Sequence, residues 1–143
     1  MADSDVVGML SRIDLFSGLS GRQLKQLAGR AKEVRHEPGH SVTSEGNVAL
    51  GFHLILEGEA TVTQGGRTRR TLGPGDHFGE ISMIDGHRRS ATVTAQTPLR
   101  AVTVSHATFE ELLDADPAFA RGLLTVLCAR LREAEDREAL ASG

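Results

Sequence analysis

Cysteine and large aromatic residues are scarce in this chain of 143 residues, which has one Cys, five Phe and neither Trp nor Tyr. The lone Cys128 cannot form an intramolecular disulfide, and its apolar neighbourhood predicts a small buried side chain. Without Trp or Tyr, there is little material for an aromatic platform on which nucleic-acid bases could stack. These shortages argue against a disulfide framework, cysteine redox chemistry and single-stranded nucleic-acid binding.

An excess of positive charge and long hydrophobic runs are also missing. The chain has 16 Lys and Arg residues and 19 Asp and Glu residues, so its formal net charge is −3. This charge gives no general attraction for nucleic acid or an anionic membrane. No apolar stretch approaches the roughly 20 residues needed to cross a bilayer, and the N-terminus has no basic segment typical of a secretion signal. We therefore expect a cytoplasmic protein of one domain, residues 1–143, that contacts no membrane and no nucleic acid directly.

The first part of the chain carries the signals of a helix start. Ser20 and Gln23 have the spacing of a capping box, in which each side chain bonds the backbone N–H of the other residue. Leu19 and Leu24 occupy the positions of a hydrophobic staple around the same cap. A helix should therefore begin directly after Ser20, and helices should extend over about residues 5–33.

The middle part, about residues 34–104, reads as short strands joined by tight turns. Apolar residues alternate with polar ones in Ala60–Val62, and a similar two-residue period runs through Phe52–Leu56. Glycine-containing turn signals separate runs of only four to seven residues: Pro38-Gly39, Glu45-Gly46, Gly58, Gly65-Gly66 and Gly73-Pro74-Gly75. This pattern predicts an antiparallel β-roll, similar to a jelly-roll barrel.

The last part, about residues 105–140, returns to helix. Ser105 can cap a short helix, and Asp116-Pro117 places an N-cap residue before a proline at the first helical position. One face of the second helix is apolar at the 3.6-residue period, and it includes Phe119, Leu123, Val126, Leu127, Leu131 and Ala134. We therefore predict an α+β fold in which N-terminal helices and two C-terminal helices flank the β-roll.

The sequence predicts that a short helical turn interrupts the strand pattern between Gly79 and Ile84. The free N–H groups at a helix start bind anions, and Gly79 lets the backbone approach a ligand closely. Glu80 would repel such an anion unless it binds a hydroxyl group of the same ligand. Arg89 supplies a planar guanidinium that matches phosphate oxygens, and Ser90 adds a hydroxyl donor. An internal ion pair between Glu80 and Arg89 is the structural alternative, although a buried pair without a ligand contributes little net stability.

At these residues the chain resembles the cyclic nucleotide-binding domain, the family of the bacterial catabolite activator and of the regulatory subunits of cyclic-AMP-dependent protein kinase. Two segments resemble the family's phosphate-binding cassette, namely Phe78-Gly79-Glu80-Ile81-Ser82-Met83 and Arg89-Ser90-Ala91. The resemblance extends over about residues 16–135, with the LFSGLS, LILEGEATV and PGDHFGE segments and the Asp-Pro start of the last helix.

The resemblance implies a role for each matching residue. Glu80 would bind the ribose 2′-hydroxyl and Arg89 the cyclic phosphate. The backbone of Gly79, Ile81 and Ser82, together with Ser90 and Ala91, would complete the cradle. Arg88 would face solvent.

The chain departs from the catabolite activator in base recognition, because Ala134 and Glu135 occupy the positions of that protein's two hydroxyl residues on the last helix. Glu135 could accept a hydrogen bond from adenine or guanine, or could lie exposed on the helix. We expect cyclic AMP as the ligand, with cyclic GMP as the second candidate.

The resemblance implies a non-enzymatic sensor that uses no other cofactor and signals by moving its C-terminal helix. Because no helix-turn-helix follows the long helix, the signal should pass through a partner protein or a homodimer along the apolar helix face. A degenerate domain that acts as an interaction module without nucleotide is one alternative. Another is a metal-dependent enzyme of the cupin type, but the six histidines do not have the spacing of a metal site.

Overall fold

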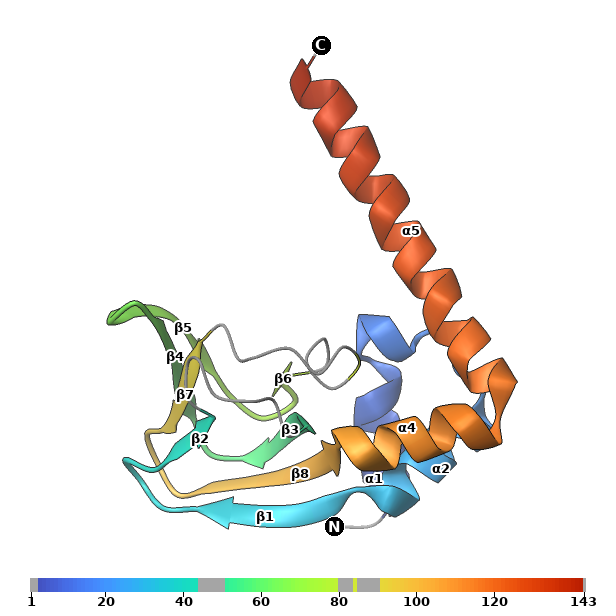
Figure 1. Cartoon of the computed structure of the whole chain (residues 1–143). Helices are drawn as coiled ribbons and strands as arrows, with labels where there is room; N and C mark the ends of the chain where they lie inside the picture. The colour runs from blue at the N-terminus through green and yellow to red at the C-terminus, as the bar shows by residue number, and fades with distance from the viewer. Residues whose placement is uncertain (1–2, 44–50, 80–83, 85–90, 143) are drawn as a thin grey trace. The chain divides into compact units, whose positions relative to one another are not determined.

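The computed structural model describes residues 3–43, 51–79, 84 and 91–142 (Figure 1). Residues 30–111 form one compact unit, the β unit, and residues 1–29 with 112–143 form a second, the helical unit. That the whole chain is one domain stays a prediction. The described helices are α1 (Asp3–Ser11), the 3-10 helix η1 (Asp14–Phe16), α2 (Gly21–Arg30), α4 (His106–Ala115) and α5 (Pro117–Ser142).

The described strands all lie in the β unit and form two antiparallel sheets. One sheet has the strand order β1-β8-β3-β6 and the other has the order β2-β7-β4-β5. The strands are β1 (Lys32–His36), β2 (Ser41–Thr43), β3 (Gly51–Glu57), β4 (Ala60–Gln64), β5 (Arg67–Leu72), β6 (His77–Phe78), β7 (Thr92–Ala95) and β8 (Leu99–Ser105). The expected α+β fold with an antiparallel roll is confirmed.

One hydrophobic cluster joins the two sheets of the β unit. Ile55, Phe78 and Leu99 belong to the first sheet. Ala60, Val62, Leu72, Val93 and Ala95 belong to the second. Because the cluster takes buried side chains from both sheets, it is the interior of the roll.

Strand β3 is buried along six of its seven residues rather than on one face alone. Ile55 belongs to the cluster inside the roll, so His53, two residues earlier, lies on the same face. Phe52 and Leu54 lie on the opposite face, where they pair with the buried Val104 and Val102 of β8. A strand covered on both sides in this way is continuously hydrophobic with few polar exceptions.

The predicted cap of α2 is present. The Ser20 backbone N–H donates to Gln23 Oε1 at 2.8 Å, and the Gln23 N–H donates to Ser20 Oγ at 3.2 Å. Gln23 also donates from Nε2 to the Asp116 carboxylate at 3.3 Å, so the same side chain joins two segments of the helical unit. Leu19 and Leu24 of the predicted staple are both buried.

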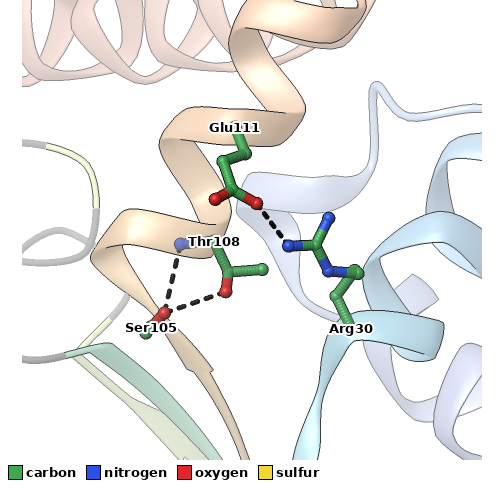
Figure 2. A network of polar contacts seen from close by, with 4 residues as sticks. All are labelled: Arg30, Ser105, Thr108 and Glu111. Atoms are coloured by element: carbon green, nitrogen blue, oxygen red, sulfur yellow. Dashed lines mark hydrogen bonds and ion pairs between the residues drawn. The ribbon is translucent and has the colours of Figure 1, made fainter.

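The predicted caps of the two C-terminal helices are also present. The Thr108 N–H donates to Ser105 Oγ at 3.1 Å, and the Ala118 N–H donates to Asp116 Oδ1 at 3.0 Å. Figure 2 shows the first of these caps, together with an ion pair between Arg30 and Glu111 in the β unit.

The predicted apolar face of α5 is buried at Phe119, Leu123 and Val126, whereas Leu127 and Leu131 are exposed. The expectation of a buried Cys128 is wrong, because this residue lies away from the buried positions of the helix and is exposed. Among the described helices, none is both long and apolar enough to span a membrane.

Candidate functional site

The candidate site is the cassette at residues 78–91. Of the site residues predicted from the sequence, the structure describes Phe78, Gly79, Ala91 and Glu135. The remaining predicted site residues lie outside the described part of the chain, namely Glu80, Ile81, Ser82, Arg89 and Ser90.

Both ends of the cassette are attached to the interior of the roll. Phe78, the last residue of β6, is 7% exposed and belongs to the cluster between the sheets. Ala91, directly before β7, packs against the same cluster. Phe78 and Ala91 therefore place the two ends of the cassette at one core.

The turn before β6 is held to strand β3 by backbone hydrogen bonds. The Gly75 N–H donates to the Ile55 carbonyl at 2.9 Å, and the Ile55 N–H donates to the Asp76 carbonyl at 2.9 Å. The Asp76 carboxylate accepts from the Gly73 N–H at 2.8 Å and so closes the turn on itself. The chain consequently reaches Phe78 along a rigid path.

Gly79, at the start of the cassette, has a backbone conformation that favours glycine. Its φ is +87°, in the left-handed region that residues with a Cβ rarely adopt. A side chain here would strain the backbone at the start of the cassette. Gly79 is predicted as a site residue because a glycine lets the backbone approach a ligand closely, and its positive φ gives a second reason for a glycine at this position.

His53 is a residue beside the site that the sequence pattern did not reveal. Its side chain is buried at 8% exposure, and its ring stacks on Phe78 with centroids 4.8 Å apart and planes 18° apart. Its Nδ1 atom lies 3.0 Å from Thr103 Oγ1, in a hydrogen bond. In the sequence His53 alternates with the apolar Phe52 and Leu54, so the two-residue period alone predicts that His53 lies on the solvent-facing side of the strand.

Glu135, predicted as a base contact, is exposed on α5. It belongs to the helical unit, whereas Phe78 and Ala91 belong to the β unit. Its role in base recognition stays a prediction. Within the part of the chain that the structure describes, no group of three His, Cys, Asp or Glu side chains could hold a metal ion.

The family described as "Cyclic nucleotide-binding domain" matches residues 33–116 of the chain. Among curated proteins, the chain is 36% identical over 108 residues to a cAMP-dependent protein kinase regulatory subunit of Yarrowia lipolytica, which covers 74% of the chain and 29% of that protein. It is also 36% identical over 92 residues to a cGMP-dependent protein kinase of Eimeria tenella, covering 64% of the chain and 9% of the kinase. The chain thus spans less than a third of the length of these relatives.

A solved structure matches over most of the chain. It is the N-terminal domain of a transcriptional regulator from Streptomyces coelicolor, with a TM-score of 0.81 and 28% sequence identity. The match covers 90% of this chain and 95% of that domain. The likeness therefore includes the β-roll and reaches beyond the segment matched by the family.

Proposed function

Because the chain belongs to the cyclic nucleotide-binding domain family, we propose that it is a sensor that binds a cyclic mononucleotide at the cassette, residues 78–91. The observation that carries this proposal is the anchoring of both cassette ends, Phe78 and Ala91, to one hydrophobic cluster. The chain between them has the residue types that a ribose and a phosphate need. The positive φ of Gly79 supports a close approach of backbone to ligand at the start of this segment.

Each polar residue of the cassette has a distinct task in the proposed complex. Arg89 pairs with the cyclic phosphate, because a planar guanidinium matches two phosphate oxygens at once. Glu80 accepts a hydrogen bond from the ribose 2′-hydroxyl, so its negative charge does not face the phosphate. Backbone groups of Gly79, Ile81 and Ser82, with Ser90 and Ala91, complete the phosphate cradle.

Cyclic AMP is the ligand that we propose first, and cyclic GMP is the alternative. One relative is a kinase subunit whose name specifies cAMP, and another is a kinase whose name specifies cGMP, so the family supports either base. Glu135 can accept a hydrogen bond from the amino group of either purine.

The proposed output is non-enzymatic and passes through the C-terminal helix α5. Three exposed leucines of this helix, Leu124, Leu127 and Leu131, share one face and give it an apolar surface that a protein partner or a second copy of the chain can cover. Nucleotide binding would change the position of α5 and thereby expose or hide this surface.

Titration calorimetry and thermal unfolding with cyclic AMP and cyclic GMP test the proposal. A nucleotide at a hundredfold excess over its Kd should stabilise the folded protein by about 2.7 kcal/mol and raise the Tm. Arg89→Ala should abolish this shift, because losing a desolvated phosphate contact costs about 2 to 5 kcal/mol. Arg88→Ala, which changes the same charge one residue earlier, is the matched control and should keep the shift.

Failure of the wild-type chain to bind either nucleotide would contradict the sensor proposal. The remaining function would then be that of an interaction module acting through the exposed leucines of α5.

The proposed role of Glu80 predicts a selective loss. Glu80→Ala should weaken binding of the ribonucleotide by about ten- to 150-fold, the effect of one hydrogen bond to a charged group. It should change the affinity of the 2′-deoxy analogue much less, because that analogue has no hydroxyl for Glu80 to bind. Equal losses for the two compounds, measured by calorimetry, would show that Glu80 does not contact the 2′-hydroxyl.

A further inference from the structure

Three residues form a row across the first sheet, on the side that faces the interior of the roll. Thr103 of β8 is the register partner of His53 on β3, and His53 is in turn the register partner of Phe78 on β6. Register partners on antiparallel strands project from the same face of the sheet. His53 therefore lies between the Thr103 hydroxyl on one side and the Phe78 ring on the other.

The polarity of His53 is unusual for its location. Among the described residues, His53 and Gln23 are the buried polar side chains, and Gln23 is accounted for by its helix cap and its bond to Asp116. A buried polar group costs free energy unless it is hydrogen-bonded, whereas an apolar residue at position 53 would pack without that cost. The bond from His53 to Thr103 offsets the cost of burial and gives the ring a property that a purely apolar residue lacks.

That property is a defined ring plane. The χ2 torsion of histidine is broad, so packing alone leaves the ring some freedom to rotate. The 3.0 Å hydrogen bond between Nδ1 and Thr103 Oγ1 selects one orientation. Phe78 stacks nearly parallel to this ring, at an interplanar angle of 18°, so a fixed imidazole also fixes the phenyl ring.

We propose that His53 is a positioning residue for nucleotide binding, which acts through Phe78 and Gly79 on the start of the cassette. This inference rests on the proposed function. Phe78 is followed directly by Gly79 at φ +87°, from which the chain enters the cassette. Holding Phe78 in one orientation before the ligand arrives means that this side chain has less freedom to lose on binding. His53 itself needs no contact with the nucleotide.

Two conservative variants separate this positioning from simple packing. Thr103→Val removes the hydroxyl at nearly constant volume, and His53→Phe keeps an aromatic ring against Phe78 but removes the nitrogen that bonds Thr103. We expect each variant to fold and to bind cyclic AMP or cyclic GMP about two- to tenfold more weakly than the wild type, the effect of one further side chain that must be ordered on binding. The double variant should bind no more weakly than His53→Phe alone, since that single variant already lacks the bond to Thr103.

The control is Leu54→Val, on the same strand but on its opposite face. This variant removes a buried methylene group and lowers the Tm, but it should leave nucleotide affinity unchanged at a temperature where the protein is fully folded. A second readout is the ¹⁵N spectrum of the His53 imidazole. Its signals are assigned as those that are missing from the spectrum of His53→Phe. Its signals should shift on addition of nucleotide.

The outcomes distinguish this inference from the function on which it rests. A wild-type chain that binds neither nucleotide overturns both. A wild-type chain that binds, with His53→Phe and Thr103→Val binding equally well, overturns the positioning role and leaves the sensor function intact. Parallel weakening in Leu54→Val would likewise overturn it, because the losses would then follow stability rather than ring orientation.

Discussion

At the scale of single residues, Arg100 illustrates how one side chain joins three strands of the first sheet. From β8 it donates to Glu33 of β1 through Nη1 and to Glu57 of β3 through Nη2, each at 2.6 Å. These hydrogen bonds to Arg100 hold the pKa values of both glutamates below their ordinary value. The hydrogen bonds to Glu57 and Glu33 in turn raise the pKa of Arg100.

Removal of Arg100 should change how stability depends on pH. A carboxylate whose pKa is lower in the folded state stabilises the protein above its unfolded pKa, about 4.3 for glutamate, and loses this effect as the pH falls through the folded value. Arg100→Gln should therefore lower the Tm by a few degrees at neutral pH, and the difference from wild type should shrink below about pH 4. Thermal unfolding across this range measures it.

The control for this measurement is Arg69→Gln, since Arg69 is exposed on β5 and the substitution removes the same charge. A Tm difference for Arg100→Gln that stays constant down to pH 2 would show that the glutamates are not the source of its contribution.

At the scale of elements, two glycines allow close contact inside the helical unit. Gly122 of α5 lies against Gly18, just after η1, and a Cβ added at position 122 would come within 2.6 Å of the Gly18 carbonyl oxygen. An ion pair between Arg130 Nε and Asp14 Oδ2, at 2.7 Å, joins the same two elements. The backbones approach so closely because neither glycine has a side chain.

Gly122→Ala should therefore destabilise the protein although alanine favours helix. The added methyl group meets backbone atoms that cannot move freely, and overpacking of this kind costs about 1 to 3 kcal/mol. Gly29→Ala is the matched control, because a Cβ at that position in α2 meets nothing within 4 Å and should stabilise the helix by up to about 1 kcal/mol. Denaturant unfolding compares the two, and equal free energies of unfolding would contradict the close contact.

At the scale of the whole molecule, α5 is unevenly covered. The helix has 26 residues, about 39 Å at 1.5 Å per residue, but burial of its large apolar side chains ends at Val126. Beyond that point Leu131 is 60% exposed and Leu140 is 82% exposed. Leu124, Leu127 and Leu131 are exposed at spacings of three and four residues, so they share one face of the helix, and such a face favours contact with another surface, in agreement with the proposed output.

The double substitution Leu127→Gln with Leu131→Gln should leave stability within about 0.5 kcal/mol of wild type, because both side chains are already exposed. Nucleotide affinity should also persist.

Sedimentation velocity at rising concentration then distinguishes the two proposed binding partners of the α5 surface. A second copy produces a wild-type dimer that the substitutions abolish, whereas a partner protein leaves both forms monomeric. A large fall in Tm would show that the leucines are packed against the chain itself.

The amino-acid sequence alone determined the local features of this protein. The capping box at Ser20 and Gln23, the caps at Ser105 and Asp116, and the turn glycines depend on hydrogen bonds and backbone angles within a few residues, so they can be recognised from spacing. The antiparallel roll followed from short alternating runs between turns. The cassette was recognisable because its residue types and spacing are specific.

Only the tertiary structure decided which side chains are buried, because burial depends on segments that are distant in the chain. Alternation placed His53 on the surface, but β3 is covered on both faces and the ring lies against Phe78 and Thr103. Periodicity continued the apolar face of α5 to Ala134, yet Leu131 and Cys128 are both exposed. A pattern of residue types shows which face of an element is apolar. Whether another element packs against that face is a property of the fold.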